Sequence, residues 1–292
     1  RSSNWMLVAF GMIGTSLSGV TFVSVPGAVA NESFAYFQIT IGYLLGYITI
    51  AYVLLPLYYK LNLTSIYNYL SGRLGFKSYK TGASFFILSR TLGATARLYL
   101  VVKILQDALP ASVNIPFWVT TLVILVMILL YTYEGGVKTI VWTDTLQTTF
   151  MLSGLVICVV YLLNQMGMSF GDSISAMNEK GYSKIFFTNP ESKFFFLKQI
   201  LAGAFITITM TGMDQEMMQK NISVKTLKDS QKNVLTLGVI LMIVLMLFLF
   251  LGAVLLLFAE QQGITAVGDK LFPAIALNHM PPIVSVIFII AL

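Results

Sequence analysis

Charged residues are scarce in this sequence, and that scarcity is the first constraint on what the chain can be. Only 10% of its 292 residues are Asp, Glu, Lys or Arg, whereas 57% are hydrophobic. Soluble domains carry about 25% charged residues, so the composition excludes an ordinary soluble domain and places the chain in a membrane. The net charge of +6 therefore does not indicate a nucleic-acid partner. Loop lysines account for it through the positive-inside rule.

Cysteine and histidine are almost absent. The single cysteine, Cys158, lies in an apolar run, which excludes a disulfide framework and predicts a buried thiol. The single histidine, His279, precedes two prolines in a predicted external loop. The sequence thus offers no His or Cys cluster for a metal, and it contains neither a nucleophile–base constellation nor a phosphate loop. We expect a protein that is not an enzyme.

Long hydrophobic runs dominate the chain. Runs of about 20 residues are long enough to cross a bilayer. We predict spans near 5–27, 36–58, 81–108, 115–133, 140–165, 194–218 and 232–259, and the beginning of an eighth near 282. Lys and Arg are concentrated in alternate loops, which predicts that these loops are cytoplasmic and that the first span runs outward.

The ends of the chain lie inside this pattern. It begins at Arg1 rather than at a methionine, and it ends at Leu292 within an apolar run. We therefore expect residues 1–292 to be a single transmembrane transporter domain, truncated at both ends, with about seven full spans and a partial eighth.

Two of the predicted spans are interrupted by small and polar residues. In the first span the interruption covers residues 14–21, and in the sixth it covers residues 203–212. A broken helix survives in lipid only where protein or a cavity satisfies its backbone, and its freed carbonyls suit a small cation. The two spans are five apart and cross in opposite directions, which indicates a transporter's midplane site. The alternative is that the small residues only allow close helix packing.

Polar side chains within the spans are the candidates for binding. Arg90 lies inside the third span, where a charge needs a cavity and a partner, so we expect it to meet an anionic group or a gating partner. A structural pairing with a carbonyl or an Asp is the alternative. Arg97 shares its face, and Lys103 and Asp107 are expected to snorkel to the interface.

Three further polar positions complete the candidates. Asp144 enters the fifth span beside threonines and could hold a departing cation, or it could stabilise a helix start. Gln38 could donate to a solute or to a neighbouring helix. Asp214 follows the break in the sixth span and is expected to be solvated.

Three stretches together resemble the sodium:solute symporter family. They are Ser3-Asn4-Trp5 with the Gly14-to-Gly27 run, Tyr133-Glu134-Gly135-Gly136 through Trp142-Thr143-Asp144, and Gly212-Met213-Asp214-Gln215. The resemblance implies an all-α membrane protein with a LeuT-like fold of inverted five-helix repeats, of which this chain would hold the first repeat and the start of the second.

The resemblance also implies a sodium site. Its ligands would include the backbone carbonyls of Gly14 and Leu17, and the remaining ligands would lie on a ninth helix beyond the end of this chain. Asp144 matches a carboxylate used near the sodium exit, or at a second sodium site in some members. Na⁺ is therefore the expected cofactor.

For the solute, the stretch 17–26 is similar to the bacterial sialic acid symporters. That similarity implies contacts from Ser18, Thr21, Gln38 and Arg90, with Thr207 and Met210 of the broken sixth span completing the predicted solute site. Sugar-transporting members carry Gln, Tyr and Lys where Thr21, Met210 and Leu241 stand, which argues against a hexose.

We therefore predict a symporter that couples inward sodium flow to import of a small, carboxylate-bearing solute. Its partners would be sodium, the solute and the lipid of a bacterial inner membrane, with no nucleic acid and an undetermined oligomeric state. Another solute, such as a sugar, proline or pantothenate, is the alternative within the same family. A channel would need a continuous polar stripe, which the spans lack. A non-transporting sensor of the same fold is the remaining alternative.

Overall fold

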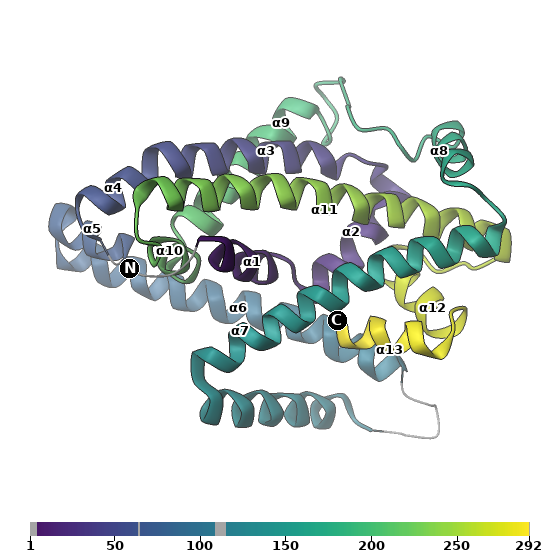
Figure 1. Ribbon diagram of the computed structural model, residues 1–292, viewed down its shortest axis with the longest axis horizontal. Coiled ribbons are helices and arrows are strands. Elements are labelled where there is room, and N and C mark those ends of the chain that lie inside the picture. Colours follow the sequence, from purple (N-terminus) through teal and green to yellow (C-terminus); the bar gives the residue numbers. More distant parts are fainter. Residues whose placement is uncertain (1–4, 64, 109–114, 292) are drawn as a thin grey trace. The chain divides into compact units, whose positions relative to one another are not determined.

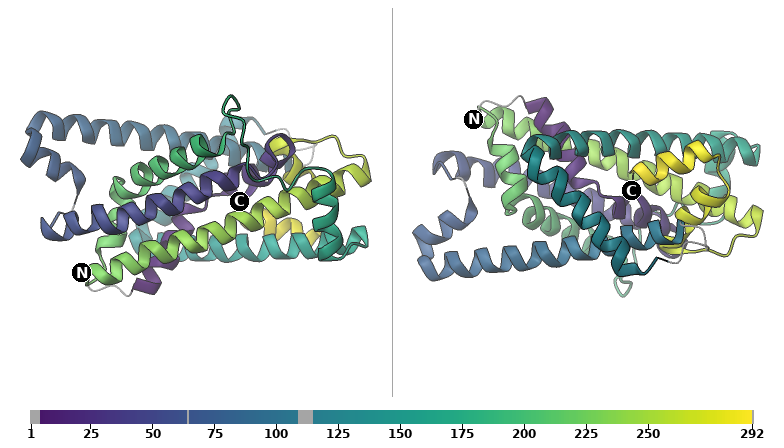
Figure 2. Two further views of the ribbon diagram at one scale, coloured as in Figure 1. Left: turned by 90° about the horizontal axis from the view of Figure 1, so that it is seen from above. Right: turned by 90° about the horizontal axis from the view of Figure 1, so that it is seen from below.

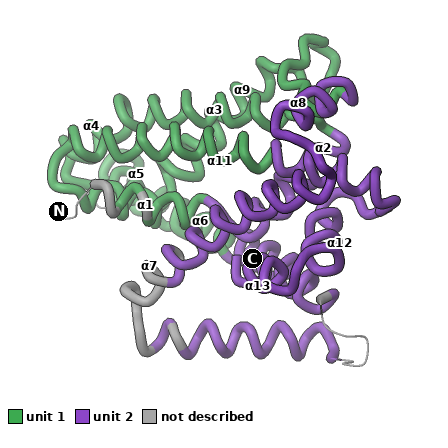
Figure 3. The backbone as a smooth tube through the Cα atoms, turned by 45° about the vertical axis from the view of Figure 1, so that its right-hand side comes forward, with its two compact units in different colours: residues 1–16, 32–90, 181–249 green, residues 17–31, 91–180, 250–292 purple. Residues whose placement is uncertain are grey.

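The computed structural model describes residues 5–63, 65–108 and 115–291. Side chains are described for all of these except residues 5–7, 10, 108, 131, 134–142 and 144. Across these ranges every regular element is a helix, and an isolated β-bridge pairs Phe187 with Phe195. The chain divides into two compact units, one of residues 1–16, 32–90 and 181–249 and the other of residues 17–31, 91–180 and 250–292 (Figure 3). Each unit is built from segments far apart in the sequence.

The first unit is a bundle of broken and continuous helices. Its elements are α1 (Trp5–Ser16), α3 (Tyr36–Thr49), the π-helix η1 (Ile50–Leu54), α4 (Leu55–Lys60), α5 (Ile66–Leu74), the first part of α6 (Phe76–Ala108), α9 (Phe196–Thr207), the π-helix η2 (Ile208–Gly212), α10 (Gln215–Ile222) and most of α11 (Leu227–Gln262). Helices α3 and α11 run side by side (Figures 1 and 2), and Gly238 leaves room there for the ring of Tyr47.

Helices α3 and α9 make the tightest contact of this unit. A Cβ added to Gly42 would lie 2.1 Å from the carbonyl oxygen of Ile200, and one added to Gly203 would lie 2.1 Å from that of Ile39. No side chain fits at either position, so the two glycines allow the backbones to touch. Close packing is thus one real role of the small residues in the sixth predicted span.

The second unit has an aromatic core. Its elements are α2 (Gly19–Glu32), the rest of α6, α7 (Phe117–Met166), α8 (Phe170–Glu179), the end of α11, the 3₁₀-helix η3 (Gly268–Lys270), α12 (Leu271–Asn278) and α13 (Pro282–Ala291). Phe22, Phe272 and Phe288 are all buried, with ring centroids 4.9 to 5.6 Å apart. These rings tie α2 to α12 and α13, because edge-to-face and offset pairs at this spacing are favourable.

The predicted spans agree with the helices at most positions. Four described helices are long and apolar enough to cross a membrane: Tyr36–Lys60, Phe76–Asp107, Thr145–Met166 and Leu227–Gln262. The pair Phe196–Gly212 and Gln215–Ile222, bent by 70° at a break, makes a fifth if it is counted as one span. The first predicted span, 5–27, is divided into α1 and α2. Cys158 is buried, as expected.

The predicted fourth and fifth spans both lie on one helix, which changes direction between them (Figure 1). Residues 117–166 are assigned to one helix, α7, of 50 residues. Only its part Thr145–Met166 meets the length of a span, and Phe117–Leu130 is a shorter apolar helix. At 1.5 Å per residue a straight helix of this length would reach about 75 Å, more than twice the hydrocarbon thickness of a bilayer. In Figure 1 the ribbon of α7 changes direction between these two parts.

Candidate functional site

The first helix break lies where the sequence predicts it. Helix α1 ends at Ser16 and α2 begins at Gly19, which leaves Leu17 and Ser18 outside regular helix. The boundary between the two compact units falls at the same point of the chain, between Ser16 and Leu17. Gly14 lies in the last turn of α1, and Leu17 is almost fully buried.

Ser18 and Thr21 cap the start of α2 reciprocally. The backbone N–H of Ser18 donates to the hydroxyl of Thr21, and the N–H of Thr21 donates to the hydroxyl of Ser18, both at 3.4 Å. The two hydroxyls also lie 3.3 Å apart within hydrogen-bonding distance of each other. In a continuous helix the N–H of Thr21 would bond to the carbonyl of Leu17. The cap diverts that donor, so it leaves the Leu17 carbonyl available as a ligand.

The second break follows the π-helix η2. Helix α10 begins at Gln215, bent by 70° from the preceding helix. Asp214 caps α10 because its Oδ1 accepts a hydrogen bond of 2.9 Å from the N–H of Met217. Asp214 retains only 5% of its accessible surface, which shows that our expectation of a solvated carboxylate was wrong.

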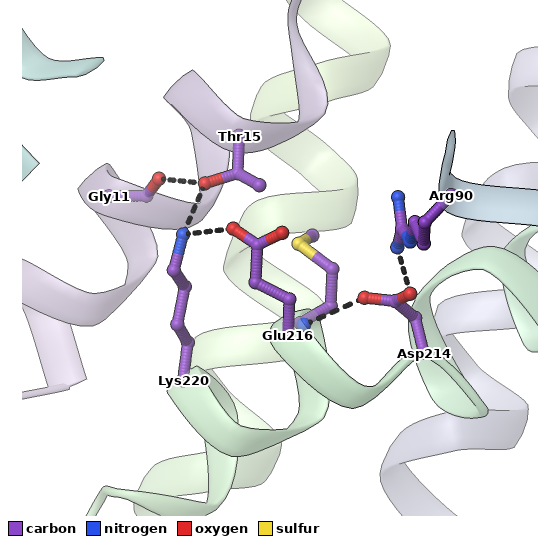
Figure 4. A network of polar contacts seen from close by, with 7 residues as sticks. Gly11, Thr15, Arg90, Asp214, Glu216 and Lys220 are labelled. Atoms are coloured by element: carbon purple, nitrogen blue, oxygen red, sulfur yellow. Dashed lines mark hydrogen bonds and ion pairs between the residues drawn. The ribbon is translucent and has the colours of Figure 1, made fainter. Parts of the chain in front are cut away.

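Arg90 is the partner of this buried carboxylate. Its guanidinium forms an ion pair with the other oxygen of Asp214 (Figure 4). It also lies 5.7 Å from the ring centroid of Phe86. The Arg90 side chain is 33% exposed and that of Asp214 only 4%. Removing Arg90 would leave the buried carboxylate of Asp214 without a countercharge, which is costly. The sequence-based alternatives of a gating partner and a structural Asp partner both match this contact.

A second polar network joins α10 to α1 within the first unit. Lys220 donates to Glu216 at 2.9 Å and to the hydroxyl of Thr15 at 2.7 Å (Figure 4). The Thr15 hydroxyl in turn donates to the carbonyl of Gly11 at 3.0 Å. The last turn of α1 is thus anchored to the helix that follows the other break.

Gln38 is fully buried and its amide is engaged by backbone. It donates to the carbonyls of Ala35 and Phe194 at 3.2 and 3.1 Å, and it accepts from the N–H of Phe187 at 3.2 Å. These bonds tie α3 to the segment before α9. They are closer to the predicted alternative, in which Gln38 forms hydrogen bonds within the protein, than to a role in solute binding.

The remaining predicted residues are distributed over both units. Thr207 is buried at the end of α9 against Gly46, whereas Met210 is 58% exposed in η2. Arg97 is exposed and donates to the carbonyl of Gly93 in its own helix. The side chain of Asp144 lies outside the described residues.

From the sequence we misread Asp214, the partner of Arg90, and missed Lys220. Asp214 and Lys220 stand in a polar stretch that a hydropathy pattern assigns to water. The position of Asp214, directly after a break and three residues before Met217, does indicate a role, because an Asp there can cap a helix. Its pairing with Arg90, 124 residues away, leaves no local trace.

Comparison with known proteins agrees with this arrangement. A model described as "Sodium:solute symporter family" matches residues 1–291. The chain is 24% identical over 225 residues to the sodium/iodide cotransporter of Homo sapiens, a match that covers 77% of this chain and 34% of that protein. It is 26% identical over 230 residues to the sodium-dependent multivitamin transporter of Oryctolagus cuniculus, covering 78% and 35%.

A bacterial relative and a solved structure extend the comparison. The sodium/sialic acid symporter of Proteus mirabilis is 23% identical over 272 residues, covering 86% of this chain and 50% of that protein. The structure of a Na⁺-coupled sialic acid symporter in a substrate-bound, outward-open state matches with a TM-score of 0.85 at 21% identity, covering 100% of this chain and 62% of that one. The likeness confirms the predicted all-helical, LeuT-like fold. The chain spans about a third to a half of the length of these curated relatives.

Proposed function

We propose, from the premise that this chain belongs to the sodium:solute symporter family, that the protein is a sodium-coupled secondary active transporter that imports a small organic carboxylate. The observation that carries the proposal is the pair of broken helices, α1–α2 and α9–η2–α10. Stable membrane helices need no such breaks. Paired breaks expose backbone groups for an ion and its solute.

For sodium, we propose ligands at the first break. The carbonyls of Gly14 and Leu17 would hold the ion, because oxygen atoms of neutral groups suit a small hard cation. The reciprocal cap of Ser18 and Thr21 supports this role, since it removes a competing N–H from the Leu17 carbonyl. Asp144 would assist near the sodium exit.

For the solute, we propose that Arg90 meets its carboxylate, with Ser18 and Thr21 bonding to its polar groups and Thr207 and Met210 contributing from the other break. Arg90 would then exchange Asp214 for the solute, because one guanidinium fork suits one carboxylate at a time. Asp214 keeps a partner during the exchange. Its other oxygen remains bonded to the N–H of Met217, at the positive end of α10.

Uptake into proteoliposomes tests the coupling. We expect the full-length protein to accumulate labelled N-acetylneuraminate or lactate under an inward sodium gradient, and to stop when choline replaces sodium. Uptake that is unchanged in choline would contradict the proposal. Sodium and solute should also raise each other's affinity by the same factor, because coupling is reciprocal.

Replacing Arg90 tests the solute class. The Arg90→Ala variant should lose carboxylate binding in calorimetry while sodium binding stays measurable. Arg97→Ala is the matched control, since Arg97 is on the same helix and bonds only within it among the described contacts. Retained carboxylate affinity in Arg90→Ala, or uptake of iodide or glucose in place of carboxylates, would favour the alternative solutes of the family. Sodium-dependent solute binding without any transport would favour the sensor alternative.

We further propose a location in a bacterial plasma membrane, as a multi-pass protein. The apolar helices support the membrane, and the similarity to the Proteus mirabilis symporter supports the bacterial origin. Fractionation of cells that express the protein from its own gene tests this location.

A further inference from the structure

Lysine and phenylalanine are concentrated in residues 184–198, the segment that leads into α9, and neither the sodium nor the solute proposal uses them. The segment holds three lysines, Lys184, Lys193 and Lys198, and a single acidic residue, Glu191. It also holds five phenylalanines, at positions 186, 187, 194, 195 and 196. Positive charge next to large apolar side chains is typical of segments that lie at the surface of a membrane.

Two of the lysines are held in place by aromatic rings. The ammonium of Lys184 lies 4.7 Å from the ring centroid of Phe187, and that of Lys193 lies 4.5 Å from the ring centroid of Phe194. The two rings are themselves 5.6 Å apart, so the two ammonium groups belong to one cluster. Both lysines are exposed, and neither forms an ion pair within the described part of the chain. Their N–H groups therefore remain available to an anion.

The backbone beneath these rings is fixed to helix α3. The buried Gln38 bonds to the N–H of Phe187 and to the carbonyl of Phe194, and the N–H of Phe34 donates to the carbonyl of Lys184 at 3.0 Å. A ligand would thus meet a surface that is already ordered, which lowers the entropic cost of binding.

Helix α9 continues from this segment with an exposed apolar stripe. Leu197, Leu201 and Phe205 are all exposed and share one face of the helix. Gly203, on the opposite face, packs against α3. The stripe rises about 12 Å along the helix, close to the hydrocarbon depth of one leaflet, about 15 Å. An acyl chain can follow this stripe.

The third lysine places positive charge at the start of the stripe. Lys198 is exposed and follows Leu197 directly, and its ammonium reaches back to the segment, where it donates to the carbonyl of Pro190 at 2.6 Å. The charge and the stripe together select the ligand. A phospholipid with a net negative charge offers a phosphate to the lysines and a chain to the stripe. A free anion would leave the stripe uncovered, and a zwitterionic lipid brings a cation of its own.

We propose that Lys184, Lys193 and Lys198, together with the stripe of α9, form a binding site for an anionic phospholipid. The lysines bind the phosphate of the headgroup, and one acyl chain lies along Leu197, Leu201 and Phe205. The inference rests on the proposed location in a membrane and makes no assumption about the solute.

Fluorescence quenching tests the site in the full-length protein. Leu197→Trp places a fluorophore in the stripe, and the signal of the unaltered protein, which holds three tryptophans, is subtracted. The probes are phosphatidylglycerol and phosphatidylcholine with brominated acyl chains, each at the same mole fraction in unbrominated phosphatidylcholine vesicles. The introduced tryptophan should be quenched preferentially by phosphatidylglycerol, with a preference of about fivefold for each lysine that contacts it.

A triple substitution assigns the preference to the lysines. Lys184→Gln with Lys193→Gln and Lys198→Gln should abolish it, so that both brominated lipids quench the introduced tryptophan equally. Lys225→Gln with Lys228→Gln and Lys232→Gln is the matched control. It removes the same charge from exposed lysines that the charge pattern assigns to the opposite side of the membrane. A preference that survives the first triple substitution, or that the control removes equally, would overturn the proposal.

Two further measurements separate the sources of the phosphate and the two proposals. Glycerol 1-phosphate, a headgroup without chains, should not displace the brominated phosphatidylglycerol; displacement would overturn the site in favour of a free anion. Native mass spectrometry of the unaltered protein should show phosphatidylglycerol retained in preference to phosphatidylcholine, without an introduced tryptophan. Sodium-driven uptake into the same vesicles tests the proposed function separately. Uptake without any lipid preference would overturn the lipid site alone, and lipid preference without uptake would overturn the transport proposal alone.

Discussion

The two helix breaks of this protein are built from different chemistry. The break before α2 is capped by two neutral hydroxyls, those of Ser18 and Thr21, which bond to each other's backbone N–H. The break before α10 is capped by a buried carboxylate, Asp214, which carries its own cation in Arg90. Both satisfy the orphan N–H groups of a helix start.

The difference separates two roles that a broken membrane helix can have. A neutral cap adds no charge of its own, so the nearby carbonyls remain suited to a cation that comes from solution. The Asp214 carboxylate is already paired with Arg90, so it is not suited to a cation from solution. Its pairing changes only when another anion competes for the guanidinium. We infer that the first break responds to sodium and the second to the carboxylate of the solute.

The largest effect should come from removing the charged cap. Asp214→Ala removes the α10 cap and a charge-assisted bond to Arg90, and we expect a loss of about 2–4 kcal/mol in the free energy of unfolding. Denaturation of the purified protein followed by circular dichroism measures it. Asp229→Ala is the control, since Asp229 is only partly buried and bonds locally to Thr226.

A second substitution checks that the loss comes from the unpaired arginine. Adding Arg90→Met to Asp214→Ala should recover part of the stability, because no buried charge is then left without a partner. A double variant less stable than Asp214→Ala would contradict the ion-pair account.

The next effect concerns the packing that leads into the second break. Gly203→Ala should cost about 1–3 kcal/mol, because its Cβ would meet the carbonyl of Ile39 and backbone cannot yield as a side chain can. Thermal unfolding in detergent measures the change. Gly72→Ala, in a helix with nothing within 4 Å of the added Cβ, should be neutral or slightly stabilising. Equal effects of the two substitutions would show that α3 and α9 do not touch as described.

Removing the neutral cap should reduce stability less than removing Asp214 does, but it should affect sodium binding more. Ser18→Ala should cost about 1 kcal/mol, the usual value for a lost N-cap. It should also raise the sodium concentration needed for half-maximal uptake, because the N–H of Thr21 can then return to the Leu17 carbonyl. Ser24→Ala, on the same helix, is the control. An unchanged sodium dependence in Ser18→Ala would show that the cap does not influence sodium binding.

The smallest effect comes from a cap outside the spans, at α8. Hydrogen bonds from the hydroxyl and N–H of Ser169 lower the pKa of Asp172 below its ordinary value of 3.8. A carboxyl with a depressed folded pKa stabilises the helix above the ordinary pKa, and that stability is lost as the pH falls through the lowered one. Hydrogen exchange of residues 170–179 should therefore be protected at neutral pH and lose protection in acid. In Asp172→Asn this acid-dependent step should be absent.

Much of the fold could be predicted because its causes are local. Spans follow from runs of apolar residues, and the break at Leu17 and Ser18 follows from a cluster of Gly, Ser and Thr. The second break was predicted within residues 203–212 but begins after them, because the π-helix η2 carries the chain to Gly212 before it turns. The local amino-acid composition indicates which stretch of a helix is easily broken, but it does not determine the residue at which the helix ends.

The missed parts depend on contacts between distant residues. The burial of Asp214 follows from Arg90 in another helix, and the engagement of Gln38 follows from the segment that contains Phe187 and Phe194. No spacing within one helix encodes such pairs. The solute roles of Ser18, Thr21, Thr207 and Met210 and the sodium roles of Gly14, Leu17 and Asp144 stay predictions that the proposed experiments test.

The most direct test of the contrast between the breaks is the thermal stability of the full-length protein in sodium chloride and in choline chloride at equal ionic strength. Sodium that binds only the folded protein raises its melting temperature by mass action. Our account predicts that sodium raises the melting temperature of the wild type and of Asp214→Asn, and that Ser18→Ala needs more sodium for the same rise. A sodium effect that is lost in Asp214→Asn and unchanged in Ser18→Ala would contradict it.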